Sequence, residues 1–249
     1  MQALLFSAIA GIFGFGLGGT ASAVLLKRPS ENATNLIMSF ASGIMVSIGC
    51  FSLIPEAIAL SGVWVSAGGI VIGVLVIIAL NKLIDKVTEA SRGDIVSDQK
   101  RILRAGIYVL AAISLHTIPE GIAIGASSSH SLQLGAVLAV MIALHHIPEG
   151  MAIAAPLLAG GMGRGKVVCL TALTGAPALL GGFIGMAIGN ISDLIVAVAL
   201  SAAGGAMLFV MFAEVIPQSL AKSKKLKSPV MIMLGFLVGL IISQVLETA

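Results

Sequence analysis

The chain is organised as long apolar runs that short polar breaks interrupt. A helix needs about 20 apolar residues to cross about 30 Å of hydrocarbon. Eight runs reach that length, and they cover residues 2–26, 34–60, 62–84, 103–127, 131–159, 163–188, 191–219 and 227–247. Only one connection, residues 85–102, is long, polar and mixed in charge. The pattern predicts an all-α polytopic membrane protein with eight transmembrane helices in a single domain spanning 1–249.

The composition supports this prediction. Hydrophobic residues make up 58% of the 249 and charged residues only 10%, whereas soluble domains carry about 25% charge. A water-soluble surface could not be built from so few charges, so a soluble enzyme, a nucleic-acid-binding protein, a disordered protein and a disulfide scaffold are excluded. The bilayer is therefore an expected partner and nucleic acid is not. Cys50 and Cys169 lie within apolar runs, and we expect them to be small buried hydrophobic residues.

The basic residues predict the orientation in the membrane. All 14 fall at odd-numbered connections: Lys27, Arg28, Lys82, Lys86, Arg92, Lys100, Arg101, Arg104, Arg164, Lys166, Lys222, Lys224, Lys225 and Lys227. Lysine and arginine concentrate in cytoplasmic loops. We therefore expect the loop 85–102 to be cytoplasmic and both termini to be extracytoplasmic.

Two internal repeats are present. Residues 116–121 read His-Thr-Ile-Pro-Glu-Gly, and residues 145–150 read His-His-Ile-Pro-Glu-Gly, 29 positions later. A weaker echo at an offset of 162 joins the second run to the seventh; it pairs Ala41, Gly43, Met45, Ile54 and Pro55 with Ala203, Gly205, Met207, Ile216 and Pro217. The second and seventh runs cross in opposite directions, as in an inverted repeat of a transporter. The layout would then be 3+2+3, although coincidence between two apolar helices rich in glycine and methionine is the other reading.

Four carboxylates lie within the apolar runs, and no lysine or arginine accompanies them: Glu56, Glu120, Glu149 and Glu214. A charge at the bilayer centre costs at least about 2.5–3.5 kcal/mol. These groups must therefore be protonated, solvated in a cavity or neutralised by a bound cation. We interpret the imbalance as the signature of a cationic substrate.

The spacing of the repeated motif narrows the cation. His116 and Glu120 are four residues apart, as are His145 and Glu149, so each pair lies on one face of its helix. Two antiparallel helices joined by a short loop would bring both pairs to one depth. Imidazole and carboxylate ligands together suit Zn²⁺ and similar ions. The alternative is that the pairs are structural hydrogen bonds between helices.

With its duplicated His-x-Ile-Pro-Glu-Gly motif, eight runs and one long loop after the third, the chain resembles the ZIP (Zrt/Irt-like) family of divalent metal transporters, in particular its prokaryotic members. The resemblance implies uptake of Zn²⁺, with Fe²⁺, Mn²⁺ and Cd²⁺ as further substrates, across the cell membrane and by an elevator-like movement. It implies a primary metal site of His116, Glu120, His145 and Glu149, with His146 as an auxiliary ligand. Some members bind a second metal, but Thr117 and Ala176 replace ligands here, so we expect a single high-affinity site.

Two carboxylates lie away from the centre. We expect Glu56 to attract cations at the outer entrance and Glu214 to assist release at the inner exit; ordinary interfacial solvation is the alternative for both. Met45 and Met207 could act as soft ligands, although packing is the commoner role of methionine.

Two other functions remain open. An intramembrane metalloenzyme would need a glutamate free to act as a base, and both repeats lack a spare one, so we do not expect an enzyme. A metal-binding membrane protein that does not transport is the second alternative. No cofactor is expected beyond the metal substrate, and a homodimer is possible.

Overall fold

The computed structural model describes residues 2–25, 31–89, 98–189, 192–222 and 226–247, and these residues form helices with no strand among them. In chain order the elements are α1 (Gln2–Ala8), η1 (Ile9–Phe13), α2 (Gly14–Leu25), α3 (Glu31–Ile48), η2 (Gly49–Leu53), α4 (Ile54–Glu89), α5 (Asp98–His130), α6 (Leu132–Ala159), α7 (Arg164–Thr174), α8 (Pro177–Gly189), α9 (Asp193–Val210), η3 (Met211–Val215), α10 (Ile216–Lys222) and α11 (Lys227–Glu247). The three η elements are single π-helical turns. The prediction of an all-helical membrane protein is confirmed.

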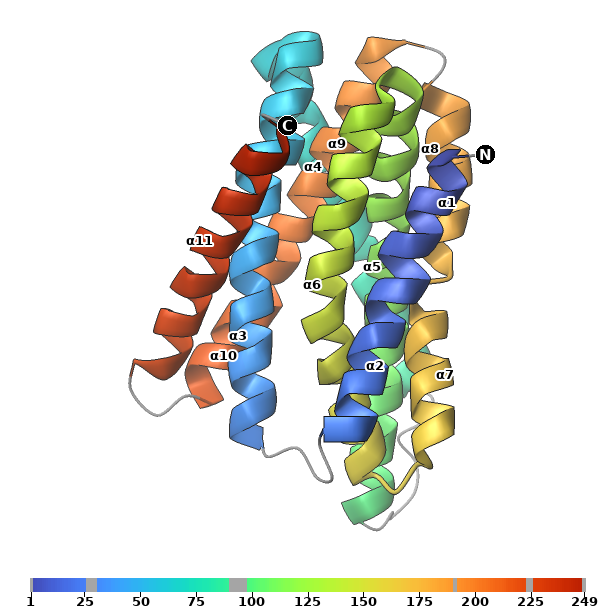
Figure 1. Ribbon diagram of the computed structural model, residues 1–249, viewed down its shortest axis with the longest axis vertical. Coiled ribbons are helices and arrows are strands. Elements are labelled where there is room, and N and C mark those ends of the chain that lie inside the picture. The colour runs from blue at the N-terminus through green and yellow to red at the C-terminus, as the bar shows by residue number, and fades with distance from the viewer. Residues whose placement is uncertain (1, 26–30, 90–97, 190–191, 223–225, 248–249) are drawn as a thin grey trace.

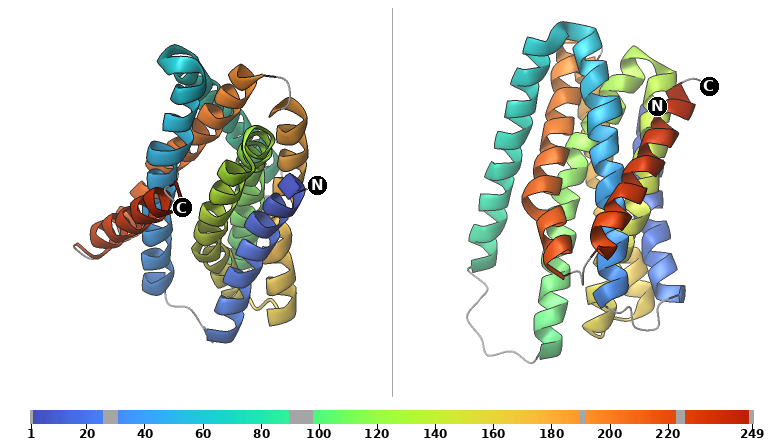
Figure 2. Two further views of the ribbon diagram at one scale, coloured as in Figure 1. Left: turned by 45° about the horizontal axis from the view of Figure 1, so that its top comes forward. Right: turned by 90° about the vertical axis from the view of Figure 1, so that its left-hand side faces the viewer.

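Seven segments of the described chain are long and apolar enough to cross a membrane. One of them, Asn35–Ala79, has 45 residues, which at about 1.5 Å per residue is roughly twice what a crossing requires. Gly62 interrupts this segment with φ 78° and ψ 169°, a conformation that glycine adopts without steric cost. Within α4, the cyan part of the chain reverses direction at the top of the right-hand view in Figure 2. The sequence predicts a break between two spans at this residue, whereas the count of seven takes the whole stretch as one segment.

Other boundaries differ from the sequence prediction. The predicted span 163–188 is divided into α7 and α8 by a break at Gly175 and Ala176, because Pro177 lacks the amide proton that a continuous helix needs. Helix also extends into the predicted loop 85–102 from both sides, through Glu89 and from Asp98. Its remaining residues, 90–97, lie outside the described residues. The apolar pattern marks only the part of a helix that lies in hydrocarbon, and polar helix formers continue it further.

The cysteine prediction is wrong. Both Cys50 and Cys169 are exposed on the helical surface. An exposed apolar side chain on a membrane-spanning helix faces lipid, which is as apolar as a protein core. Apolar surroundings in the sequence therefore do not predict burial in this class of protein.

The helices pack as two groups. The first group consists of α1, η1, α2, α5, α6, α7 and α8, with α5 lying along α8 and α6 and with α2 lying along α6 and α7. The second group consists of α3, η2, α4, α9, η3, α10 and α11, with α4 lying along α9 and α3 along α11. The seam between the groups joins α5 to α9 and α3 to α6. Figures 1 and 2 show the two groups side by side.

The two ends of the molecule differ in charge. The start of α1 and the end of α11 lie toward the upper end in Figure 1. The lysines and arginines whose side chains the structure describes are Lys82, Arg164, Lys166 and Lys227, and all are exposed. Arg164 and Lys166 begin α7, and Lys227 begins α11, at the opposite, lower end. None of these cations reaches the middle of the bundle.

Candidate metal centre

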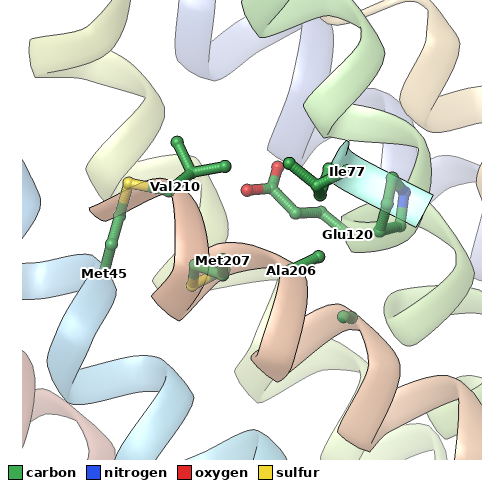
Figure 3. Close-up of a pocket in the computed structure, with 8 residues that line it drawn as sticks. Met45, Ile77, Glu120, Ala206, Met207 and Val210 are labelled. Atoms are coloured by element: carbon green, nitrogen blue, oxygen red, sulfur yellow. The ribbon is translucent and has the colours of Figure 1, made fainter. Parts of the chain in front are cut away.

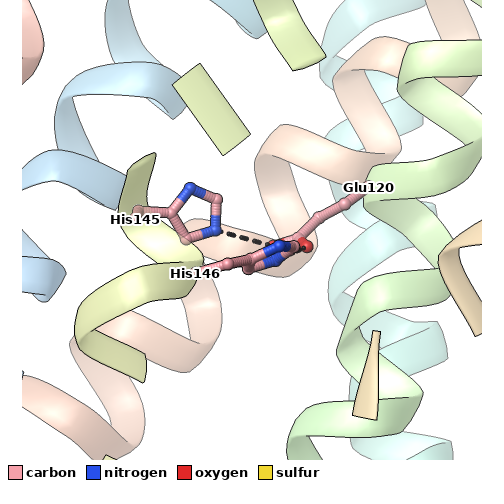
Figure 4. Close-up of side chains that lie close together, drawn as sticks. All are labelled: Glu120, His145 and His146. Carbon is pink, nitrogen blue, oxygen red and sulfur yellow. Dashed lines mark hydrogen bonds and ion pairs between the residues drawn. The ribbon is translucent and has the colours of Figure 1, made fainter. Parts of the chain in front are cut away.

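Three ligand-type side chains of the first group meet near the seam with the second. Glu120 comes from α5, and His145 and His146 come from α6. One potential ligand atom from each lies within 4.8 Å of the other two. Glu120 is 4% exposed and both histidines are fully buried, and Figure 4 shows the two imidazoles directed at the carboxylate.

Each carboxylate oxygen of Glu120 faces one histidine. Nε2 of His146 lies 2.8 Å from Oε2 in hydrogen-bond geometry. Nε2 of His145 lies 3.4 Å from Oε1, close enough for an ion pair but outside hydrogen-bond geometry. That nitrogen is therefore buried without a hydrogen-bond partner among the described residues. An unpaired buried nitrogen is costly unless another ligand completes its environment.

The other ring nitrogen of each histidine contacts a backbone carbonyl. Nδ1 of His146 lies 2.7 Å from the Ala10 oxygen, and Nδ1 of His145 lies 3.4 Å from the Met141 oxygen. A proton on Nδ1 satisfies those carbonyls and leaves the lone pair of Nε2 facing Glu120. Carbonyls that fix the tautomer in this way commonly orient metal-binding histidines.

The carbonyl that holds His146 is available because of a π-helical turn. In an α-helix the amide of Gly14 would bond to Ala10, but in η1 it bonds to Ile9 and Gly11 instead. Single π-helical turns of this kind occur frequently at functional sites. Phe15, also fully buried, stacks on His146 with ring centroids 4.1 Å apart. The Ala10 carbonyl of η1 and the Phe15 ring of α2 together fix the position of this imidazole.

Glycine allows α2 to come close enough to do this. A Cβ atom at Gly14 would lie 2.8 Å from the His146 Cβ atom and 2.8 Å from the Ala143 oxygen. One turn later, a Cβ atom at Gly18 would meet the Ile147 oxygen. Real side chains do not tolerate such distances, so the crossing of α2 and α6 requires glycine at both positions.

The arrangement is suited to hold a cation. An ionised carboxylate only accepts hydrogen bonds, and a neutral imidazole with its proton on Nδ1 presents a lone pair at Nε2. Each Nε2 lone pair and the carboxylate oxygen that it faces repel each other unless a proton or a cation lies between them. Because none of the described lysines or arginines is near, the compensating charge must come from a proton or a bound ion.

The predicted ligands do not all fall into this cluster. Glu149 is buried one turn after His145, close enough to it for an electrostatic attraction, but it is not one of the three clustered residues. His116 lies on α5 one turn before Glu120, and its side chain lies outside the described residues. His146, expected as an auxiliary ligand, makes the shortest contact to Glu120.

The remaining predicted positions lie elsewhere. Glu56 begins α4 and Glu214 lies in η3, and both are half-buried. The buried Thr117 hydroxyl donates to the Ser114 oxygen of its own helix at 2.8 Å. Ala176 occupies the break between α7 and α8.

A narrow cavity of about 10 Å³ lies beside the Glu120 carboxylate (Figure 3). It is lined by Met45, Ile77, Pro119, Glu120, Ala203, Ala206, Met207 and Val210. This is around the smallest volume that accepts one water molecule. The cavity lies at the seam, because Met45, Ile77 and the lining residues of α9 belong to the second group.

Sequence reasoning missed the residues that orient His146, namely Ala10 and Phe15. The only signal for them is a glycine-rich segment that comes after Ala10 and includes Phe15, namely Gly14-Phe15-Gly16-Leu17-Gly18-Gly19. It indicates a close helix crossing, but it does not name the partner helix.

The fold and the cluster together define a helical, multi-pass membrane protein with a buried cluster of metal-ligand side chains. Comparison with known proteins gives its family. The family described as ZIP Zinc transporter matches residues 85–243. The chain is 32% identical over 208 residues to zinc transporter ZupT of Escherichia fergusonii, covering 80% of each chain. ZupT of Enterobacter sp. (strain 638) is 32% identical over 212 residues, again with 80% of each chain covered.

The chain therefore belongs to the ZIP zinc transporter family. It is a membrane transporter and not an enzyme, which removes the metalloenzyme alternative. Its place is the cell membrane, as the sequence predicts. Divalent metal transport is the activity that its relatives support.

Proposed function

We propose that this protein imports divalent transition-metal ions, Zn²⁺ first among them, through the cluster of Glu120, His145 and His146. The observation that carries the proposal is the convergence of two Nε2 atoms on one buried carboxylate, with no described basic residue nearby. Imidazole and carboxylate are the ligands that Zn²⁺ accepts in open, exchangeable sites. Fe²⁺, Mn²⁺ and Cd²⁺ are the further candidate substrates.

We propose that His116 and Glu149 complete the ligand set. Each lies one helical turn from a member of the cluster, on the same face of its helix. Glu56 would then attract cations at the entrance and Glu214 would receive them at the exit. The replacements at Thr117 and Ala176 favour one high-affinity metal rather than two.

We also propose eight crossings with both termini outside. The reversal at Gly62 divides the longest segment into two, and the ends of the described chain lie toward one end of the bundle (Figure 1). Arg164, Lys166 and Lys227, at the starts of α7 and α11, lie at the other end, which the positive-inside rule assigns to the cytoplasm. The 3+2+3 order gains support from η2 and η3, which lie 162 positions apart, the same offset as the sequence echo.

The test is uptake of radioactive zinc into proteoliposomes. His145→Ala removes the histidine whose Nε2 lacks a hydrogen bond, and Glu120→Gln removes the charge that both histidines face. We expect each variant to lose saturable uptake almost completely. His130→Gln, a histidine at the exposed end of α5, is the matched control and should keep it.

Equilibrium dialysis of zinc against the detergent-solubilised protein separates transport from binding. The wild type should bind zinc and both variants should bind it more weakly. Wild-type uptake by either variant would contradict the site. Zinc binding without uptake by the wild type would favour a non-transporting metal-binding protein.

A further inference from the structure

The part of α4 that follows Gly62 presents one continuous exposed face. Its exposed residues recur at intervals of three and four positions, which places them on a single side of the helix. We call this face, from Trp64 to Lys82, the α4 stripe; its large apolar members are Val71, Ile72, Leu75 and Val76. In the right-hand view of Figure 2 the teal part of α4 forms an outer edge of the bundle.

The opposite face of the same helix is packed against α9. A Cβ atom at Gly69 would meet the Ser201 hydroxyl, and one at Gly73 would meet the Ala202 oxygen. On the stripe, by contrast, a Cβ atom at Gly68 would find no atom within 4 Å. The part of the chain that the structure describes therefore covers one side of α4 and leaves the stripe open.

The two ends of the stripe differ in chemistry from its middle. Trp64, the only tryptophan of the chain, is 87% exposed, and Lys82 is exposed as well. Residues 65–81 between them include no charged residue. The two ends are 18 positions apart, which at about 1.5 Å per residue is about 27 Å. The hydrocarbon core of a bilayer is about 30 Å thick.

We propose that the α4 stripe is a phospholipid-contact surface, with Trp64 anchored in the headgroup layer of one leaflet and Lys82 in that of the other. The indole ring is apolar with one N–H donor, a combination that favours the boundary between headgroups and acyl chains. The apolar stem of lysine follows the helix while its ammonium reaches the lipid phosphates.

A phospholipid fits this surface better than a second copy of the chain. Lipid supplies acyl chains for the middle of the stripe and polar groups at both ends. Two copies related by an axis along the membrane normal would instead bring two Lys82 ammonium groups to the same depth, where like charges repel.

The anchors have a consequence for the centre of the molecule. Because the glycine face of α4 lies against α9, the depth of α4 in the bilayer also sets the depth of α9. Helix α9 supplies Ala203, Ala206, Met207 and Val210 to the cavity beside Glu120. The lipid contact thus fixes the level of one wall of that cavity. It goes beyond the proposed function and does not depend on it.

The single tryptophan is the probe for the test. All tryptophan emission of the unmodified protein in proteoliposomes comes from Trp64. The vesicles contain phosphatidylcholine brominated either near the headgroup or near the ends of the acyl chains, because bromine quenches only a ring that it contacts. We expect the shallow label to quench Trp64 at least about twofold more than the deep label does.

Two variants that move the tryptophan along the stripe are the matched controls. In the Trp64→Phe, Leu75→Trp variant the ring lies 11 positions further on, near the middle of the hydrocarbon, so the deep label should quench it more. In the Trp64→Phe, Lys82→Trp variant the shallow label should again quench more. This sequence of shallow, deep and shallow positions is the signature of a helix face that spans the bilayer in contact with lipid.

Stronger quenching of Trp64 by the deep label would overturn the anchor, as would quenching by iodide in the water with none by either lipid label. Stronger quenching by the deep label at position 82 would overturn the second anchor. Weak quenching by both labels at positions 64 and 75 would mean that a second copy covers the stripe, and the lipid surface would be refuted. The unmodified protein decides on Trp64 even where a variant does not fold. Since no ion has to cross the membrane, the result is the same whether or not the protein transports zinc.

Discussion

Helices of the same group contact one another in a different way from helices on the two sides of the seam. At the crossing of α5 and α8, a Cβ atom at Gly121 would meet the Ala178 oxygen, and one at Gly181 would meet the Ile118 oxygen. The backbones are therefore in direct contact. Between the groups, α5 faces α9 across side chains that include Met207 and Val210, with a cavity among them.

The second group has contacts of the same kind within the pair α3 and α11 and within the pair α4 and α9. A Cβ atom at Gly43 would meet the Ile232 oxygen of α11, and one at Gly73 would meet the Ala202 oxygen of α9. None of the close approaches that the described glycines make joins a helix of one group to a helix of the other. Small residues are the main means by which helices associate tightly in lipid.

The difference indicates which parts of the molecule can move. A backbone contact tolerates little displacement, because closer approach or sliding of the two helices brings side chains against a carbonyl oxygen, and separation loses the contact. A seam of flexible side chains around a cavity can be rearranged at lower cost. We therefore expect each group to move as one body, with the candidate metal centre at the boundary along which the two bodies could shift.

The largest expected effect comes from locking the seam. Ser52 in η2 and Met141 in α6 belong to different groups, and the Ser52 hydroxyl lies 3.7 Å from the Met141 sulfur. Oxidation of the Ser52→Cys, Met141→Cys variant, with the native cysteines replaced by serine, should abolish zinc uptake, because alternating access requires the two bodies to move. Reduction should restore it, and uptake before and after reductant is the measurement.

A disulfide within one group is the control for that experiment. Asn35 and Ser228 both belong to the second group, and their side chains are 2.9 Å apart. The Asn35→Cys, Ser228→Cys variant should keep its uptake after oxidation. Full transport by the protein locked between Ser52 and Met141 would show that the groups do not move relative to one another.

Much of this architecture is accessible from the sequence. The apolar runs predict the helices, Gly62 falls at the predicted break, and the duplicated motif points to Glu120 and His145. In each case the signal is local, since length, charge and spacing along one helix determine it. The offset of 162 even pairs the regions that contain η2 and η3.

What the sequence does not predict depends on contacts between distant segments. The role of His146 requires the Ala10 carbonyl, which lies 136 positions earlier and is free only because η1 is a π-helical turn. The division into two groups depends likewise on which helix each glycine meets. An abundance of glycine predicts close packing without naming the partner.

The next effect in size concerns the backbone contacts. Gly181→Ala places a methyl group against the Ile118 oxygen, and overpacking of this kind costs about 1–3 kcal/mol. Gly68→Ala places one where no atom lies within 4 Å and should be neutral or slightly stabilising, because alanine favours helix. Thermal unfolding in detergent compares the two. Equal midpoints would mean that the first group is not held by this contact.

The smallest effect should come from a polar link across the seam at its exposed end. His130 at the end of α5 and Asp193 at the start of α9 belong to different groups, with Nδ1 and Oδ1 3.3 Å apart. Asp193 is 67% exposed at its side chain, and exposed pairs contribute at most about 1 kcal/mol. Asp193→Asn should therefore lower the unfolding midpoint only slightly, and the difference from the wild type should shrink in high salt. A loss as large as that of Gly181→Ala, unaffected by salt, would mean that the seam is fastened at its end, and the view of two bodies joined only by adaptable side chains would then fail.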